Sequence, residues 1–204
     1  HRSKYMANLN SAGIGLQPSG VMGNEPATQG QSQYFITSGV AGAIYNGEAV
    51  KITTGYILTA QATITTATLG TLNGVFYNAT STLKPTWNTY YPGSITPANS
   101  EDVTAFVNDD PLGLWIGNVD VLMGATAALA RAAAVGQTMG TTTSSGSTIN
   151  GRSDCPLTFG TIDPTANAWR MLRVVEDPSN SDMTAAFCSV VVVQNLNQII
   201  DSAA

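Results

Sequence analysis

Short β-branched and aromatic segments separated by turn residues recur along most of this chain. Thirteen threonines fall between residues 51 and 100, and the branched Cβ of threonine suits a pleated strand but restricts a helix. Strands are predicted at 33–37, 48–53, 56–69, 75–77, 102–107, 112–116, 156–161, 168–175 and 185–194. Residues 125–135 (ATAALARAAAV) have the highest helix propensity and end before Gly136, a suitable C-cap. The pattern predicts a mainly β fold, an antiparallel β-barrel or β-sandwich with one short helix.

The N-terminal segment, residues 6–32, follows neither the strand period of two nor the helix period of 3.6. Five glycines and two prolines interrupt it, yet it carries scattered apolar side chains: Leu9, Ile14, Leu16, Val21 and Met22. We expect an extended arm laid across a neighbouring subunit, with a flexible terminus as the alternative. A single β-rich domain is expected over residues 33–204. Residues 1–5 are interpreted as lying upstream of a natural start at Met6, and they contain the only histidine.

Charged residues make up 10 % of the 204-residue chain, far below the ~25 % that is usual in globular proteins. Threonine, alanine, asparagine, serine and glycine take their place. Small neutral groups lose little desolvation energy on docking, and the cores of protein interfaces are depleted of charge. The composition therefore favours a protein that works packed against other proteins, with a secreted β domain as the alternative. Eight Lys and Arg residues against thirteen Asp and Glu form no basic patch, which argues against nucleic-acid binding.

The residue types needed for catalysis are scarce. If the native chain lacks histidine, a Ser-His-Asp or Cys-His arrangement has no base. Zinc sites draw on Cys and His, so Cys155 and Cys188 alone cannot build one. These two cysteines are expected to be free buried thiols, with one disulfide as the alternative. The paired carboxylates lie in turns, where Asp caps local backbone N–H groups. We expect no enzymatic activity, no cofactor and no metal.

Residues 80–100 form a long predicted connection with three prolines and the aromatic residues Trp87, Tyr90 and Tyr91. Such connections are usually functional or packed onto something, so these side chains are candidate contacts with a partner. A sugar-stacking platform is the alternative. The longest hydrophobic run, residues 190–193, is too short to span a bilayer. With no apolar stretch like a signal peptide in the first thirty residues, we expect a soluble protein made in a cytoplasm.

Several short motifs follow one another in a recognisable order: 15–18 (GLQP), 44–50 (IYNGEAV), 74–77 (GVFY), 107–111 (VNDDP), 172–175 (LRVV) and 192–197 (VVQNLN). In this layout the chain resembles the small decoration, or cement, proteins on the capsids of tailed bacteriophages. Typical members have a carboxylate-rich strand after the Asp-Asp-Pro turn, whereas residues 112–116 here are apolar (LGLWI).

The resemblance implies a β-rich body bound to the outside of a lattice of the major capsid protein. It also implies a homo-oligomer, with a trimer expected, that is made in the cytoplasm of a bacterial host and located on the virion. Neither a nucleic acid nor a membrane is expected as a partner. The alternatives are a tail, neck or fibre-base protein of the same particle and a carbohydrate-binding β module. The candidate capsid or subunit contacts are Leu9, Ile14, Leu16, Val21, Met22, Trp87, Tyr90 and Tyr91.

Overall fold

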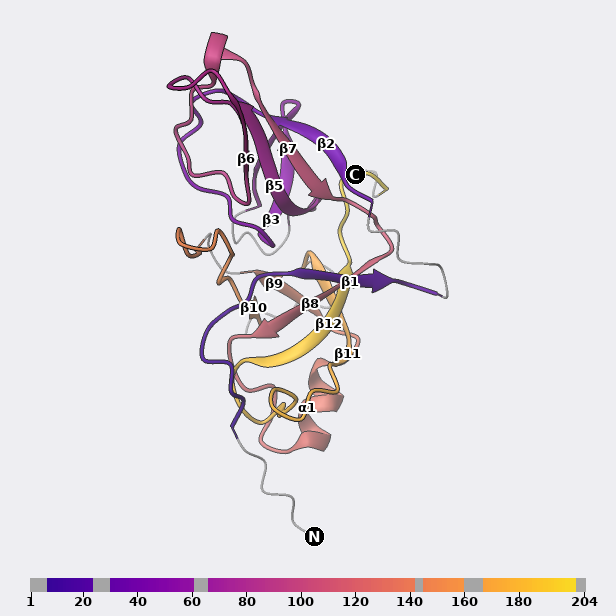
Figure 1. Cartoon of the computed structure of the whole chain (residues 1–204). Helices are drawn as coiled ribbons and strands as arrows, with labels where there is room; N and C mark the ends of the chain where they lie inside the picture. The colour runs from indigo at the N-terminus through magenta and orange to yellow at the C-terminus, as the bar shows by residue number, and fades with distance from the viewer. Residues whose placement is uncertain (1–6, 24–29, 61–65, 142–144, 160–166, 201–204) are drawn as a thin grey trace.

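The computed structural model describes residues 7–23, 30–60, 66–141, 145–159 and 167–200. Its strands form two sheets, which make two stacked lobes in Figure 1. We call them the upper lobe and the lower lobe, as they lie in that view. Each lobe has its own cluster of buried apolar side chains. The predicted mainly β class is confirmed, with a sandwich-like pair of sheets and a single α-helix in the described residues.

The upper lobe is an antiparallel sheet in the order β2-β7-β5-β3-β4, with β6 also paired to β5. Its strands are β2 (Ser32–Ile36), β3 (Ala49–Thr53), β4 (Tyr56–Thr59), β5 (Gly70–Asn78), β6 (Pro85–Asn88) and β7 (Val103–Asn108). A 3₁₀ turn, Ala98–Ser100, precedes β7. Strand β7 shows why this sequence forms a half-buried sheet, because Val103, Ala105 and Val107 are buried while Thr104 and Phe106 are partly exposed.

The lower lobe contains the other six strands and the helix. These elements are β1 (Gln17–Val21), β8 (Gly113–Val119), α1 (Ala127–Ala134), β9 (Thr138–Thr141), β10 (Leu157–Thr158), β11 (Trp169–Val174) and β12 (Cys188–Gln194). The pairings run in a circuit from β8 through β10, β9, β11 and β12 back to β8. A single parallel pair, Leu157 with Val119, joins β10 to β8, so the circuit is not a regular barrel. Every residue of β12 is buried, because β8 and β11 flank it on both sides.

Helix α1 closes one end of the lower lobe. The Thr126 side chain caps its start by accepting a hydrogen bond from the Leu129 N–H. The helix turns Ala130 and Ala134 into the core. Gly136 follows with φ of +83°, a backbone conformation that glycine adopts without the steric cost of a side chain. The predicted helix at 125–135 is confirmed, and its ends differ from α1 by one or two residues.

The two lobes are joined by backbone and side-chain hydrogen bonds. The Gly47 carbonyl accepts from the Leu16 N–H at 2.8 Å, while the Gly47 N–H donates to the Leu72 carbonyl at 2.8 Å. The Gln198 amide both accepts from and donates to the backbone of Ile52 on β3. Ala49 and Ala60, from the upper-lobe part of the chain, lie in the lower core. The prediction of one domain over residues 33–204 stays a prediction, which the unfolding experiment below addresses.

Three parts of the predicted secondary structure are wrong. Strand β4 ends at Thr59, so the predicted strand at 56–69 is broken, and residues 61–65 lie outside the described residues. The predicted connection at 80–100 contains strand β6. No strand is predicted between residues 136 and 155, yet β9 lies there, and its Thr138, Met139 and Gly140 are buried. Pairing with β10 and β11 supplies the backbone hydrogen bonds of β9, and this tertiary effect is invisible in a Gly- and Thr-rich sequence.

The N-terminal arm is extended as predicted, and its described part, residues 7–23, lies on its own chain. Strand β1 pairs with β8 of the lower lobe. The Asn8 side chain donates to the Asp182 and Ala186 carbonyls and accepts from the Asp182 N–H. The Leu9 N–H donates to the Ser179 carbonyl at 3.0 Å. These contacts bind the arm to its own lower lobe. Residues 1–5, interpreted as upstream residues, lie outside the described part.

Candidate functional site

The candidate contact residues of the arm lie in different environments. Leu16 is 2 % exposed and belongs to the lower core, so it has no side-chain surface for a partner. Ile14 and Val21 are partly buried against their own chain. Leu9 and Met22 are exposed, at 71 % and 41 %. The arm therefore offers two apolar side chains to solvent, and they lie at opposite ends of its described part.

The three aromatic residues of the 80–100 connection are separated by the fold. Tyr91 is fully buried in the upper core, where its hydroxyl donates to the Val40 carbonyl at 2.8 Å. Tyr90 stacks on Tyr45, with ring centroids 5.4 Å apart and an interplanar angle of 7°. Trp87 lies on β6 and is 51 % exposed. These residues thus do not form one platform, and only Trp87 is largely exposed.

Trp87 instead belongs to a row of aromatic side chains on the outer face of the upper sheet. Phe76 of β5 lies opposite Trp87 of β6 and, on its other side, opposite Thr104 of β7. Phe35 of β2 also lies opposite Thr104. Directly opposed residues of an antiparallel pair project from the same face of the sheet. Phe106 of β7 shares that face, since it is two residues from Thr104 along the strand.

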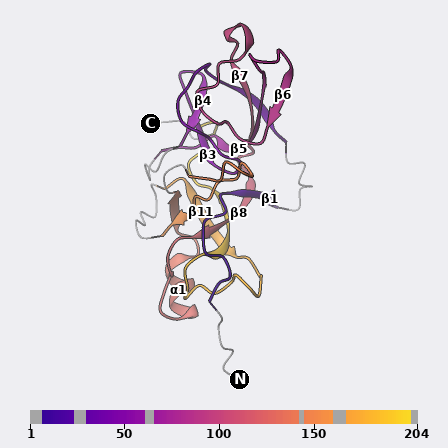
Figure 2. The ribbon, with the colours of Figure 1, turned by 60° about the vertical axis from the view of Figure 1, so that its left-hand side comes forward.

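We call Phe35, Phe76, Trp87 and Phe106 the aromatic face. Phe35 and Trp87 are 51 % exposed and Phe76 is 38 % exposed. Their strand neighbours Ile36, Val75 and Ala105 are fully buried in the upper core, as the alternation of a half-buried strand requires. In Figure 1 strands β2, β7, β5 and β6 lie next to one another in the upper lobe. Figure 2 shows β4 and β6 on opposite sides of this lobe.

A glycine on β5 determines how Trp87 lies. A Cβ atom added to Gly74 would come within 2.5 Å of the Trp87 ring, so the indole covers the bare backbone at this position. From there the ring reaches Phe106, with centroids 5.1 Å apart and an interplanar angle of 50°. Tilted aromatic pairs of this kind contribute about 0.5–1.5 kcal/mol beyond the area they bury. Gly74 therefore lets an exposed tryptophan lie flat on the sheet.

The residues that lie opposite the rings of the aromatic face are uncharged, whereas Glu101 accepts a hydrogen bond from Asn78 of β5 at the border of the face. Gln33 and Gly74 lie opposite Phe106, and Thr104 lies between Phe35 and Phe76. Charged residues, Lys84 and Asp102, occur just before β6 and β7 begin. An exposed aromatic surface with a polar border is typical of a docking surface for another molecule.

The carboxylates that the sequence places in turns cap those turns. Asp110, Asp177 and Asp182 each accept a hydrogen bond from the backbone N–H two residues further on, which confirms the predicted turn role for these three. Hydrogen bonds from the Asn180 side chain and the Ser179 N–H lower the pKa of Asp177. Asp109 accepts from the Tyr34 hydroxyl at 2.6 Å. Burial, followed by this carboxylate, raises the pKa of Tyr34 to about 12.

No group of three or more His, Cys, Asp or Glu side chains that could hold a metal ion occurs in the described residues. Cys155 and Cys188 are both buried thiols that are not joined in a disulfide, as expected from the sequence. No helix in the described part of the chain is long and apolar enough to cross a membrane. The predicted absence of catalytic activity stays a prediction.

Cys188 is expected to resist modification by thiol reagents as long as the protein is folded. Burial, and secondarily Asp182, raises its pKa to about 12. The thiolate is the reactive form, so at about pH 8 only a small fraction of the folded molecules would carry it. The experiment uses a Cys155→Ser variant, which leaves a single thiol, and follows labelling by a chromogenic thiol reagent. Full labelling in denaturant is the control, and rapid labelling of the folded protein would contradict the expectation.

Comparison of the chain with known protein families, with curated proteins and with solved structures finds no match. The resemblance to phage decoration proteins therefore stays a prediction. Sequence reasoning identified Trp87 but missed Phe35, Phe76 and Phe106. The signal for these three was their alternation with buried neighbours in predicted strands.

Proposed function

We propose that this chain is a virion structural protein that binds the outside of a tailed-phage capsid as a decoration protein. The observation that carries the proposal is the uncharged aromatic face of the upper sheet. Three of its side chains are 38–51 % exposed, and exposed aromatic patches with polar borders are typical of protein docking sites. The low charge content of the chain, 10 %, supports the same conclusion because few ions must be desolvated on docking.

Trp87 is the residue with the largest expected share of the binding energy. Interface hot spots are enriched in tryptophan, and a few buried aromatic anchors dominate most interfaces. The tilted contact with Phe106, over Gly74, holds the indole in place before a partner arrives. Because the side chain is already fixed, little conformational entropy is lost on binding. Repetition of such contacts by the symmetry of a capsid would add avidity.

A carbohydrate-binding module would use the same face, since sugars stack on aromatic rings. Three of the four rings are phenylalanine, which offers no polar atom at its edge, whereas the indole N–H of Trp87 is the one ring donor on this face. This composition favours a protein surface as the partner. A tail, neck or fibre-base role would use the same docking chemistry and differs in copy number.

The proposal is tested by locating the chain in purified particles of the phage that encodes it. We expect mass spectrometry to find the protein in tens to hundreds of copies per particle. A reconstruction of the head should show density with the two-lobed shape of Figure 1, and the aromatic face should lie against the shell. A few copies per particle would indicate a tail or neck role instead. Absence from the particle, together with binding to a glycan array, would favour the carbohydrate-binding module.

A further inference from the structure

The chain that follows β12 runs from the lower lobe onto the upper lobe, as the yellow trace in Figure 1 shows. We call residues 195–200 of this segment the strap. The Thr68 N–H donates to the Leu196 carbonyl at 3.1 Å, and the Gln198 N–H donates to the Thr68 carbonyl at 3.0 Å. These bonds make a parallel β-bridge between Thr68 and Asn197. The strap thus pairs with the chain that leads into β5.

The Gln198 side chain completes the edge of β3. Strand β3 pairs with β5 at Ala49 and Val50, and the Val50 carbonyl also accepts from the Leu69 N–H at 2.8 Å. Two residues further on, the Ile52 N–H donates to Gln198 Oε1 at 2.6 Å, and the Ile52 carbonyl accepts from Gln198 Nε2 at 3.1 Å. An amide side chain offers the same kinds of donor and acceptor as a peptide group. Gln198 therefore takes the place of a strand residue where the pairing of β3 with β5 has ended.

Three buried polar side chains support the strap. Thr68 and Asn197 are 2 % exposed, and Gln194 is 8 % exposed. Gln194 Nε2 donates to the Thr68 hydroxyl at 3.1 Å, and Gln194 Oε1 accepts from Asn197 Nδ2 at 2.7 Å. Asn197 Oδ1 accepts from the Ile199 N–H at 2.7 Å. A buried polar group costs free energy unless it is hydrogen-bonded, so these side chains are buried at low cost only while the strap is in place.

Apolar burial contributes little to the strap. Its apolar side chains are Leu196, Ile199 and Ile200, and none of them belongs to either core cluster of the described residues. Ile199 and Ile200 are 54 % and 63 % exposed. Hydrogen bonds broken on opening are replaced by bonds to water, so their net contribution to stability is small. Segments with few buried apolar contacts open locally while the rest of a protein stays folded.

We propose that the strap is a latch that opens and closes on the upper lobe while both lobes stay folded. When it is closed, it ties the end of β12 to β3 and to the chain before β5. When it is open, the backbone groups of Ile52 and Thr68 face water and the edge of β3 is uncovered. Both core clusters remain buried in either state, because the strap contributes no side chain to them. This latch is independent of the proposed capsid docking.

The first test is amide hydrogen exchange of the full chain, followed residue by residue by NMR. The N–H groups of Ile52, Thr68 and Gln198 are expected to exchange at least ~10-fold faster than that of Leu72, relative to their rates in an unstructured chain. Leu72 reports global unfolding, because it is 1 % exposed and its N–H donates to the Glu48 carbonyl at 3.0 Å. Low concentrations of denaturant should not change exchange at the strap, since its opening exposes little surface. Equal rates at all four groups, rising together with denaturant, would overturn the proposal.

The second test replaces Gln198 with methionine, which keeps a side chain of similar length but removes both bonds to Ile52. Gln198→Met is expected to speed exchange at Ile52 and Thr68 by a further ~5-fold or more, as the loss of hydrogen bonds requires. Exchange at Leu72 should not change. The proposal fails if Ile52 exchanges as in the wild type, if Leu72 is accelerated equally, or if the variant does not fold.

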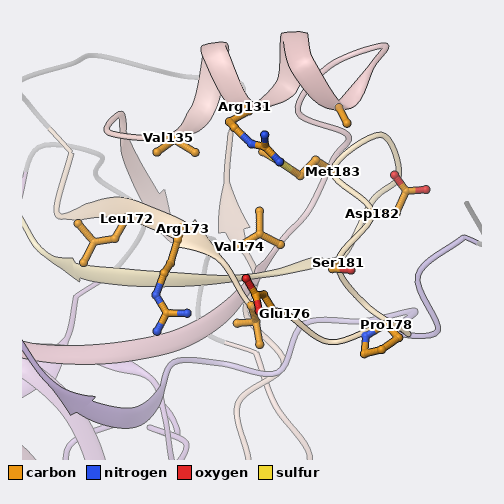
Figure 3. Close-up of a pocket in the computed structure, with 12 residues that line it drawn as sticks. Arg131, Val135, Leu172, Arg173, Val174, Glu176, Pro178, Ser181, Asp182 and Met183 are labelled. Atoms are coloured by element: carbon orange, nitrogen blue, oxygen red, sulfur yellow. The ribbon is translucent and has the colours of Figure 1, made fainter.

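Two controls make a similar change elsewhere. Gln33→Met alters an exposed glutamine on β2 of the same lobe. Arg131→Met alters the lower lobe, where an open groove of about 570 Å³ lies between α1, the end of β11 and residues 176–183. Figure 3 shows Arg131 among the side chains that line this groove. Both variants are expected to leave exchange at Ile52 as in the wild type, and acceleration there by either control would contradict the assignment of the opening to the strap.

Discussion

Replacing Trp115 with alanine is expected to lower the free energy of unfolding by about 3–5 kcal/mol, the usual cost of removing a buried tryptophan. Trp115 is 1 % exposed and meets Trp169 edge to face, with centroids 5.1 Å apart. Its indole N–H donates to the Thr71 hydroxyl of β5 at 3.1 Å. The substitution therefore leaves a cavity in the lower core and also breaks a bond between the lobes. Denaturant unfolding followed by circular dichroism measures the loss.

The Thr71→Val variant measures the contribution of the Trp115–Thr71 hydrogen bond to stability separately from that of the packing around Trp115. It keeps the side-chain volume but leaves the buried indole N–H without an acceptor, which is expected to cost about 1–3 kcal/mol. The loss in the free energy of unfolding for Trp115→Phe should lie between the losses for Thr71→Val and Trp115→Ala. A loss below about 1 kcal/mol for Trp115→Ala would mean that the lower core relaxes to fill the space. If the lobes unfold together, as the predicted single domain requires, each variant gives one transition rather than two.

Replacing Trp87 with alanine is expected to weaken binding to capsids at least ~30-fold, which corresponds to a hot-spot loss of about 2 kcal/mol. The reason is that the indole is the largest ring of the aromatic face and is 51 % exposed in the free protein. The measurement is co-sedimentation with heads that lack the protein, over a series of concentrations. The fold should persist, because Trp87 is half exposed, and the free energy of unfolding should fall by about 0.5–1.5 kcal/mol through loss of the contact with Phe106.

Two further variants show whether a loss of capsid binding by Trp87→Ala is due to the aromatic face. Leu83→Ala removes a side chain that is 73 % exposed in the same lobe but lies outside the paired strands, and it should bind like the wild type. Gly74→Ala keeps all four rings but forces the Trp87 ring from its place, since the new Cβ would lie 2.5 Å from it. It is expected to weaken binding as well. Undiminished binding by Trp87→Ala would remove the aromatic face from the docking surface.

The strands that sequence reasoning predicted best are those in which burial decides the conformation. Strand β7 alternates between buried and partly exposed residues from Val103 to Val107, and β12 is continuously buried, so each carries its own signal. Strand β1 carries no such signal, because Pro18 and Gly20 disfavour a strand. It is a strand in the structure because it pairs with β8. Strand β6 begins with Pro85, which is tolerated there because an edge strand leaves some backbone N–H groups unpaired.

The sequence predicts only part of the candidate site, because the rings of the aromatic face come together through pairing between strands that are distant in the chain. Trp87 could be named from the sequence because an aromatic side chain in a Pro-rich connection stands out. The three phenylalanines could be assigned to outward positions but not to one surface, since strand order within a sheet is a long-range property. Tyr91, from the same connection, shows the converse. Its hydroxyl donates to the Val40 carbonyl inside the upper core, and nothing local in the sequence distinguishes it from its partly exposed neighbour Tyr90.

The lower lobe is discontinuous in the chain, and this has a consequence for synthesis on the ribosome. All strands of the upper lobe lie between Ser32 and Asn108, whereas the lower lobe joins β1 to elements that follow Gly113. Val21 and Gly113 are direct partners in the β1–β8 ladder, so the chain leaves and re-enters the lower lobe at adjacent points. The upper lobe can therefore fold while translation continues. The lower lobe must wait for β12, the last strand to emerge, before β8 and β11 acquire the neighbour that lies between them.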